Sequence, residues 1–382
     1  MHFSEYVRFT EVSVVFLFAA YLFNPILSPY VKSLGFSDMQ VSWIFSLLPI
    51  SIIIFSPIMG ALSDSIGRKK VITIGIAFEM IAILLYAFGS SWIEIGLAKV
   101  LDAIGVVVVS LITLAKIEDS LDGKERGKYT GWSLSVRYLG SLIGPVVGAV
   151  MASTIFMRAP FFASFVILSV LLMFVVQKES KGHKKTRISL NPIRDVKEFL
   201  SFKKLKGMGI LGIVMHATNP AMQVFLPLLI VEKLGLNISY VGYAYFFLGL
   251  THLIQFKFGE LSDRYKPWKV LLIGCAISAT GLAFLPLSHN FVLLASVLFL
   301  MGIGNSMWNV SAWNLMSDVG EKVKEEGEIV TSYISIAKIG AFVSFVLSGL
   351  VVTYFGMNSL FLMNSLFIFM GILTSYFFFK DN

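Results

Sequence analysis

Long runs of apolar residues follow one another along almost the whole chain, separated by short polar stretches. A helix needs about 20 mainly apolar residues to cross the hydrocarbon core of a membrane. Two stretches, 270–317 and 339–379, contain no Asp, Glu, Lys or Arg, and turn residues at 286–290 and 355–359 divide each of them into two spans. The pattern predicts twelve membrane-spanning helices, at 9–32, 38–63, 71–90, 92–114, 128–152, 159–177, 207–233, 238–262, 269–287, 290–314, 328–354 and 357–379.

Composition supports a membrane protein. Hydrophobic residues make up 56% of the chain and charged residues 14%, whereas a soluble domain carries about 25% charged residues. The first run, 9–32, has no cleavage site of small residues and is longer than the core of a signal peptide, so we expect it to be a true span. Cys275 is the single cysteine, which excludes a disulfide within the chain and a cysteine metal site. We expect neither a cofactor nor a metal.

The positive charges lie in alternate loops between the predicted helices, and the opposite loops hold only Lys32, Arg158 and Lys233. Because cytoplasmic loops of membrane proteins are enriched in Lys and Arg, we predict that both termini and the central loop are cytoplasmic and that the protein lies in the cell membrane. This asymmetry accounts for the net charge of +8 without a nucleic-acid partner. The basic loops hold Arg68, Lys69 and Lys70; Lys116, Lys124, Arg126 and Lys128; the segment from Lys178 to Lys206; Arg264, Lys266 and Lys269; and Lys322 and Lys324.

Residues 178–206 form the one long polar segment between predicted helices. This linker separates an N-terminal bundle of six helices, residues 1–177, from a C-terminal bundle of six, residues 207–382. Within the linker, residues 191–202 alternate apolar and charged positions at roughly helical spacing. That spacing fits a short amphipathic helix at the membrane surface, and it fits a solvated tether equally well.

A short motif occurs twice, half a chain apart. GALSDSIGRK begins at Gly60, and GELSDRYK begins at Gly259. The glycine, leucine, serine and aspartate of the first copy, which contains Asp64, recur in the second copy, which contains Asp263 and Arg264. The second copy is weaker, because it lacks the later glycine and the full basic run. Its presence indicates two related halves.

The first copy fits the pattern G-x-L-x-D-(R/K)-x-G-(R/K)-(R/K), except that Ser65 stands where a basic residue is usual. A further stretch, DSLDGKERGKYTGW, begins at Asp119 and is followed by GSLIGPVVG. Over essentially its whole length the chain resembles the major facilitator superfamily. The resemblance implies an all-α integral membrane protein with twelve helices in two pseudo-symmetric six-helix halves. It also implies a transporter, similar to the drug/proton antiporter branch, that moves a small molecule by alternating access.

The resemblance implies a conformational latch in the first motif. Asp64 would face the N-terminal end of the eleventh helix at 328–331, where the helix dipole favours a carboxylate. Gly67 allows a tight turn, and Arg68 would reach Asp119 or the neighbouring glutamate. These contacts would hold the cytoplasmic side closed and release it as the halves rock. The alternative is that the basic residues only set the topology.

The predicted fifth helix carries Gly140, Gly144 and Gly148, each four positions from the next, and Pro145. One face of this helix therefore has no side-chain bulk, and a neighbouring helix can approach it closely. Pro145 adds a local loss of backbone hydrogen bonding. The arrangement resembles the fifth helix of family exporters that exchange substrate against protons, and it is also compatible with ordinary membrane packing.

Charged residues inside a membrane are costly, about 2.5–3.5 kcal/mol each on insertion scales, and they mark functional sites. Lys99 and Asp102 lie one turn apart on the predicted fourth helix and could neutralise each other. Asp102 could also gain and lose a proton as its surroundings alternate between wet and closed, which proton coupling requires. The sequence leaves open whether this is a coupling pair or a permanent structural pair. Glu79 stands alone on the predicted third helix, which the resemblance places outside the transport cavity.

Arg137 and Lys338 lie at matching depths on the predicted fifth and eleventh helices. They could bind a substrate carboxylate or phosphate from opposite walls of the cavity, or they could be structural charges. Further polar and aromatic residues lie at cavity depth, although a lone amide or His in a helix usually makes a packing hydrogen bond. These residues are Asn24, His216, Asn219, Gln223, His252, Asn305, Trp308 and Asn309.

Three classes of function compete for this sequence. We expect no enzyme, because HExxH, GxSxG and clustered His/Cys patterns are absent, and the absence of G-x-x-x-x-G-K-(S/T) argues against direct use of ATP. We therefore predict a secondary active transporter, in its simplest form a monomer in the lipid that exports a drug or metabolite in exchange for protons. The alternatives are an organic-anion or sugar transporter working by symport or exchange, and a receptor of the same fold that does not transport.

Overall fold

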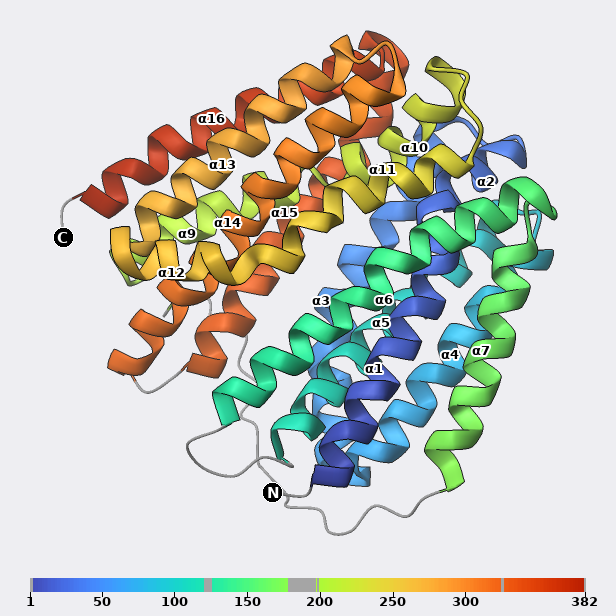
Figure 1. Cartoon of the computed structure of the whole chain (residues 1–382), viewed down its shortest axis with the longest axis horizontal. Coiled ribbons are helices and arrows are strands. Elements are labelled where there is room, and N and C mark those ends of the chain that lie inside the picture. Colours follow the sequence, from blue (N-terminus) through green and yellow to red (C-terminus); the bar gives the residue numbers. More distant parts are fainter. Residues whose placement is uncertain (1–2, 120–125, 178–196, 198, 324–325, 381–382) are drawn as a thin grey trace. The chain divides into compact units, whose positions relative to one another are not determined.

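The computed structural model describes residues 3–119, 126–177, 197, 199–323 and 326–380. Most of the linker lies outside these residues, and with it most of the amphipathic helix proposed at 191–202. The described part is all-α, without strands (Figure 1). Its elements are α1 Phe3–Phe23, η1 Asn24–Ile26, α2 Leu27–Ser33, α3 Asp38–Ile66, α4 Arg68–Phe88, α5 Trp92–Asp119, α6 Arg126–Thr154, α7 Ala159–Gln177, α9 Lys203–His216, η3 Ala221–Phe225, α10 Leu226–Leu228, η4 Leu229–Lys233, α11 Ser239–Gly249, η5 Leu250–Ile254, α12 Gln255–Tyr265, α13 Pro267–Phe284, η6 Leu285–Leu287, α14 Phe291–Val323, α15 Glu326–Phe355 and α16 Met357–Lys380.

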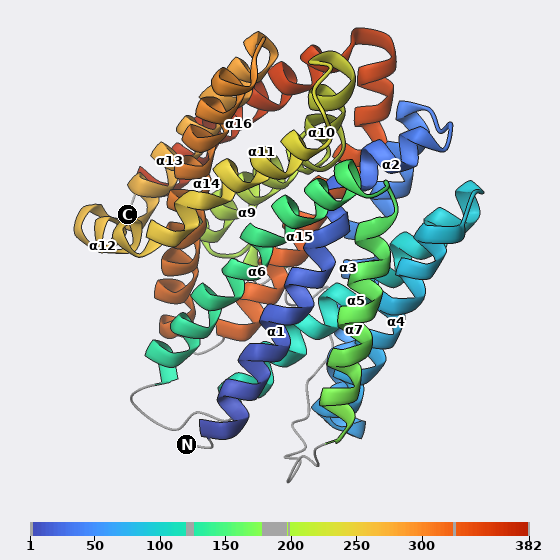
Figure 2. The ribbon, with the colours of Figure 1, turned by 45° about the vertical axis from the view of Figure 1, so that its right-hand side comes forward.

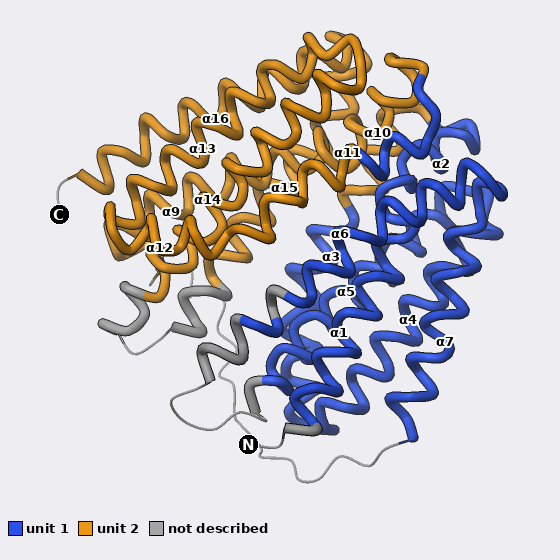
Figure 3. Tube along the Cα trace, in the orientation of Figure 1, with its two compact units in different colours: residues 1–36, 47–189, 236–243 blue, residues 37–46, 190–235, 244–382 orange. Residues whose placement is uncertain are grey.

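The chain divides into two compact units, shown in Figure 3. The division differs from the predicted N-terminal and C-terminal bundles at two helix ends. The start of α3 belongs to the second unit, and the start of α11 belongs to the first. Unit 1 comprises residues 1–36, 47–189 and 236–243, and unit 2 comprises residues 37–46, 190–235 and 244–382.

In unit 1, α4 packs along α5 and against α7, while α1 packs against α5, α6 and α7 (Figure 1, Figure 2). Glycines bring α4 and α5 close together. A Cβ atom on Gly75 would lie 2.6 Å from Cγ1 of Val108, and one on Gly105 would lie 2.9 Å from Cβ of Glu79. The close approach leaves side chains at this contact without access to solvent.

In unit 2, α13 packs along α14 and α16, and α9 packs against α15 and α16. A Cβ atom on Gly274 would lie 2.7 Å from the carbonyl oxygen of Gly304, so α13 and α14 also meet through glycines. The first turns of α3 join this unit through Ser42, whose hydroxyl lies 2.9 Å from that of Ser348 on α15. Unit 2 therefore repeats the glycine contact of unit 1.

Eleven helical runs in the described residues are long and apolar enough to cross a membrane. The eighth predicted span, 238–262, is not among these eleven: it is present as α11 and α12 but is interrupted by the 3-10 turn η5. Neither part is long enough to span a membrane by itself. The difference from the prediction is thus an interruption within the span.

Two other spans predicted as continuous helices are interrupted as well. The first span contains the 3-10 turn η1, where Pro25 has no backbone N–H to donate. The seventh contains two π-helical turns, η3 and η4, which follow Pro220 and Pro227. At each interruption, backbone groups lose their regular α-helical hydrogen bonds. The pattern of apolar residues does not distinguish such a helix from an uninterrupted one.

Gly67 alone forms the turn between α3 and α4. Its φ is +103°, a conformation that residues with a Cβ rarely adopt. Because the chain turns within one residue, Arg68 begins α4, and the basic cluster occupies the first helical turn instead of the predicted loop. In the second copy of the motif, Lys266 stands three residues after Asp263, as Gly67 does after Asp64, and has a φ of +71°.

Candidate functional site

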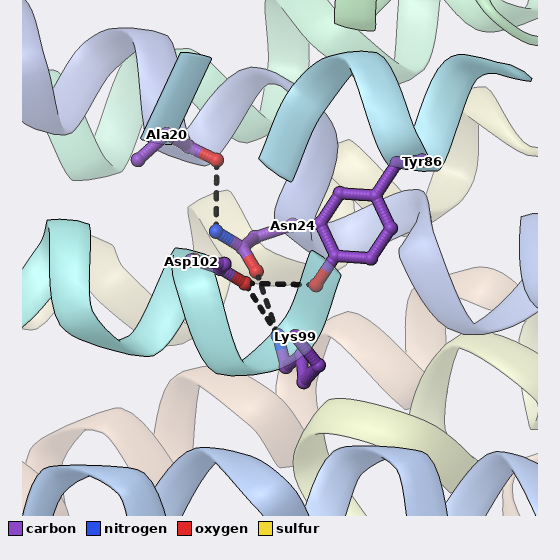
Figure 4. Close-up of polar contacts among 5 residues, drawn as sticks. All are labelled: Ala20, Asn24, Tyr86, Lys99 and Asp102. Atoms are coloured by element: carbon purple, nitrogen blue, oxygen red, sulfur yellow. Dashed lines mark hydrogen bonds and ion pairs between the residues drawn. The ribbon is translucent and has the colours of Figure 1, made fainter. Parts of the chain in front are cut away.

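Lys99 and Asp102 meet on the buried face of α5. Residues three positions apart lie on the same side of a helix, and the Lys99 Nζ is 2.8 Å from Oδ2 of Asp102 (Figure 4). The two side chains are 1% and 0% exposed. The predicted pair is therefore an ion pair that is fully enclosed within unit 1.

Two residues from other helices complete this group. The hydroxyl of Tyr86, on α4, donates a hydrogen bond to Oδ2 of Asp102 over 3.1 Å. Lys99 Nζ donates to Oδ1 of Asn24 over 3.5 Å, and the Asn24 amide donates to the carbonyl oxygen of Ala20 over 3.0 Å. Figure 4 shows these side chains converging on the ion pair. We call Asn24, Tyr86, Lys99 and Asp102 the polar cluster.

Aromatic side chains hold the Tyr86 side of the polar cluster in place. The Tyr86 ring centroid lies 5.8 Å from that of Phe23 and 6.1 Å from that of Phe161. Tyr30 donates a hydrogen bond of 2.7 Å to the Tyr86 carbonyl oxygen. Close packing of this kind excludes water, and electrostatic interactions are stronger where water is excluded.

The ion pair of the polar cluster is buried but not fully hydrogen-bonded. Burying an ionised carboxylate and ammonium costs several kcal/mol each, which their mutual attraction offsets only when hydrogen bonds satisfy both groups. Asp102 Oδ1 has no hydrogen-bond partner among the described residues. A proton on Asp102 would neutralise the carboxylate and break the ion pair with Lys99.

The glycines of α6 face α1. A Cβ atom on Gly140 or Gly144 would lie 2.6 or 2.9 Å from a backbone carbonyl oxygen of α1, and Gly148 meets α1 in the same way. Pro145 lies inside α6 without interrupting it. The face without side-chain bulk therefore serves a close contact between the first and fifth predicted spans.

Arg137 and Lys338 lie in different units. Arg137 is 8% exposed, and its Nη2 donates to the carbonyl oxygen of Ser110 over 3.4 Å. Lys338, on α15, is partly buried and acts electrostatically on His216. The hypothesis that the two cations bind one anion stays a prediction.

In unit 2, His216 lies in an aromatic group. Its ring centroid is 5.7 Å from that of Trp308 and 6.4 Å from that of Tyr333, both edge-on. The Nε1 of Trp308 and the hydroxyl of Tyr333 are buried and have no hydrogen-bond partner among the described residues. The structure thus brings together two predicted residues and one that the sequence analysis missed.

The remaining polar candidates lie in the seventh, eighth and tenth predicted spans. Oδ1 of Asn305 accepts a hydrogen bond of 2.9 Å from the Ser278 hydroxyl, which links α13 to α14. His252 lies in the interruption η5. Asn219, Gln223 and Asn309 are partly buried in the seventh and tenth predicted spans.

The first motif copy is described, but the partners proposed for its latch are not. Gly60 and Asp64 lie in the last turns of α3, and Arg68 begins α4. The side chains of Asp119 and of residues 328–331 lie outside the described part of the chain. The latch contacts proposed for Asp64 and Arg68 therefore stay predictions.

In the second copy, Oδ1 of Asp263 accepts a hydrogen bond of 3.1 Å from the side-chain amide of Asn314. Arg264 lies over the ring of Tyr265, 5.4 Å from its centroid. A Cβ atom on Gly259 would be in ordinary contact with α14. These interactions all lie within unit 2.

Two tyrosines were missed because Tyr is common within apolar runs and carries no motif. A usable signal existed for Tyr86, which lies seven positions after Glu79, two helical turns along the same face. Tyr333 had no such signal, because its neighbours in the aromatic group come from α9 and α14. Among the described residues, no group of three or more His, Cys, Asp or Glu side chains could hold a metal ion.

Apolar helices in two units and a repeated loop motif define a polytopic membrane protein built from related halves. The family model of the Major Facilitator Superfamily matches residues 12–337 and, in a second match, residues 259–382. The chain therefore belongs to the major facilitator superfamily, whose members are membrane transporters.

Similar proteins include both uncharacterized and drug-resistance transporters. An uncharacterized transporter of this type from Methanocaldococcus jannaschii is 24% identical over 353 residues, which cover 90% of each chain. The chloramphenicol resistance protein CraA of Acinetobacter baumannii is 27% identical over 72% of this chain and 68% of that protein. The class B tetracycline resistance protein of Escherichia coli is 26% identical over 66% of this chain and 64% of that protein.

Solved structures share the fold at low sequence identity. The nucleoside transporter NupG superposes with a TM-score of 0.82 at 13% identity, over 99% of both chains. A D-xylose-proton symporter gives a TM-score of 0.74 at 15% identity, over 99% of this chain and 97% of the other. The fold is thus that of the superfamily.

Proposed function

We propose that this chain exports a small molecule in exchange for protons and that Asp102 carries the proton. The observation that supports this most strongly is the enclosed ion pair between Lys99 and Asp102. Two apolar side chains would pack a helix contact as well as a buried ion pair, or better. A buried pair that carries this cost is a candidate for chemistry.

The polar cluster suggests how proton binding acts on the helices. When Asp102 is ionised, it accepts hydrogen bonds from Lys99 and Tyr86. A proton from water that binds Asp102 forms an O–H bond and removes the negative charge, which shifts the Lys99 ammonium toward Oδ1 of Asn24. Asn24 begins η1, where the first span is already interrupted. Proton binding to Asp102 would thus favour one bent conformation of this span over another. When the proton binds two conformations with different affinity, its binding is coupled to the change between them.

The substrate class is proposed from the relatives. Two proteins similar to this chain are named for resistance to chloramphenicol and tetracycline. The glycine-lined face of α6 resembles the fifth helix of family exporters. We therefore infer a drug-like or metabolite substrate that moves outward through the cell membrane.

Purified protein in liposomes tests the proposal. For an antiporter, an acidic interior should drive uptake of chloramphenicol or tetracycline into the liposome. Asp102→Asn should abolish the dependence of uptake on the pH gradient while the protein stays folded. Glu94→Gln is the matched control, because Glu94 lies at the exposed start of the same helix and accepts hydrogen bonds from Ser90 and Ser91. Full gradient-driven uptake by Asp102→Asn would contradict the proposal.

Export of an organic anion is the second candidate. Lys338 acts electrostatically on His216, and the free donors of Trp308 and Tyr333 lie in the same aromatic group. A cation and donors without partners in the same unit would favour a ligand rich in acceptors. Lys338→Gln should then weaken binding of organic anions far more than binding of neutral compounds, as measured by thermal shift. Equal effects on both kinds of ligand would return Lys338 to a structural role.

A further inference from the structure

Glu79 is a carboxyl group that the polar cluster does not include. It lies on α4, its side chain is 0% exposed, and neither carboxyl oxygen has a hydrogen-bond partner among the described residues. A Cβ atom on Gly105 would lie 2.7 Å from Oε2 of Glu79, so the carboxyl group fills the space that this glycine leaves open. An ionised carboxylate enclosed in this way, without donors, would be strongly destabilising.

The charges around Glu79 cannot compensate it. The groups that act on it electrostatically are Asp102 and Lys99, both on α5. Tyr86, on its own helix, already donates to Asp102. α4 also packs against α7, and residues 159–177 contain no Asp, Glu, Lys, Arg or His. One lysine thus faces two carboxyl groups.

The other charged residues considered on α4 and α5 either have partners of their own or lie far from Glu79 along the helix. Glu94 accepts hydrogen bonds from backbone N–H groups at the start of α5, and Lys116 pairs with Glu5 at 3.2 Å. The basic residues 68–70 lie nine or more positions before Glu79, which is about 14 Å along a helix. None of these groups takes the place of a second cation beside Glu79.

The second half shows that the helix contact needs no acid at this position. The contact between α13 and α14 has the same glycine frame at identical spacing, and a serine stands where Glu79 stands. That serine donates to Asn305 over 2.9 Å. The counterparts are Gly274 for Gly75, Ser278 for Glu79 and Gly304 for Gly105.

We propose that Glu79 is a second proton-binding site, which carries a proton while Lys99 and Asp102 form their ion pair. In this state the three groups are neutral in sum. Release of the proton breaks the carboxyl O–H bond, and the proton passes to Asp102 or to water. The role of Glu79 in coupling rests on the proposed function, whereas its protonation in the described conformation does not.

Infrared difference spectroscopy of the purified protein in lipid tests the protonation. At near-neutral pH, the spectrum of the unaltered chain minus that of Glu79→Gln should contain the C=O stretch of a protonated carboxyl group. The matched control Glu94→Gln should not alter this band. A Glu79→Gln spectrum that keeps every protonated-carboxyl band would overturn the proposal.

A second variant covers a failure of Glu79→Gln to fold. Glu79→Asp keeps the acid but moves it away from Gly105, so the protonated-carboxyl band should shift in frequency and not disappear. An unshifted band in Glu79→Asp would assign the signal to another group and would overturn the assignment to Glu79.

Transport separates this inference from the proposed function. In liposomes, Glu79→Gln should lose uptake of tetracycline driven by a pH gradient but retain exchange of tetracycline at equal pH. Undiminished gradient-driven uptake by this variant would overturn the coupling role. If uptake by the unaltered chain is independent of the gradient, the proposed function fails, and the infrared result still decides whether Glu79 binds a proton.

Discussion

The contact between α4 and α5 and the contact between α13 and α14 share a frame of glycines but bury different side chains. The first contact encloses acids, a lysine and a tyrosine, and the second encloses aliphatic side chains and a serine. At identical sequence spacing, the counterparts are Ser278 for Glu79, Leu285 for Tyr86, Leu298 for Lys99 and Met301 for Asp102.

This difference shows that helix packing at such a contact does not require the charged residues found in unit 1. In unit 2, Leu298 and Met301 are 0% and 2% exposed, so apolar residues fill this kind of contact completely. The charges of unit 1 are therefore not needed for packing, since the glycine frame of unit 2 forms without them. A chain that needed only packing would lose nothing by repeating the apolar version.

Removal of Lys99 should have the largest effect on the stability of the contact between α4 and α5. Lys99→Met leaves two buried carboxyl groups without a cation and should lower the free energy of unfolding by about 3–5 kcal/mol. Unfolding in mild detergent measures this loss.

Leu298→Met is the matched control, because it changes one apolar side chain for another at the counterpart position. Its cost should stay below about 1.5 kcal/mol. Equal losses for Lys99→Met and Leu298→Met would show that the charge of Lys99 does not matter for stability.

Substitution of the facing glycines should have the next largest effect. Gly105→Ala and Gly304→Ala should each destabilise the protein by about 1–3 kcal/mol, because extra atoms in a filled contact force the helices apart. Gly304→Ala should cost more, since its Cβ would lie 2.7 Å from the backbone nitrogen of Ser278, whereas part of the clash at Gly105 is with the movable carboxylate of Glu79. Melting temperatures of both variants check this order, and a harmless Gly304→Ala would contradict it.

The two motif turns should give the smallest effects, of opposite sign. Gly67 and Lys266 both have positive φ, but only Lys266 has a Cβ that this conformation strains. Lys266→Gly should therefore raise the free energy of unfolding by about 1 kcal/mol, and Gly67→Ala should lower it by about as much. Thermal unfolding of the two variants side by side checks the signs. A stabilising Gly67→Ala would contradict this prediction, since it would mean that the turn can leave the positive φ of Gly67 at no cost.

The apolar runs predicted the order and position of the helices well, since the cost of unpaired backbone groups in a membrane leaves helices as the only solution for such runs. They did not predict the interruptions. Pro25 and Pro220 accompany breaks, whereas Pro49, Pro57 and Pro145 lie inside continuous helices. Whether a proline interrupts its helix depends on neighbouring helices, which can stabilise or replace the lost hydrogen bonds.

The sequence by itself determined the membrane class, the helix order, the duplicated motif and the pairing of Lys99 with Asp102, because each depends on composition or on residues a few positions apart. Only the tertiary structure placed Tyr86 and Asn24 on this pair and enclosed Glu79 against Gly105. Those contacts join different helices. These contacts depend on which faces of the helices meet and on how closely they approach. Glycine spacing shows that a helix can approach another closely, but the packing of the whole unit decides which helix that is.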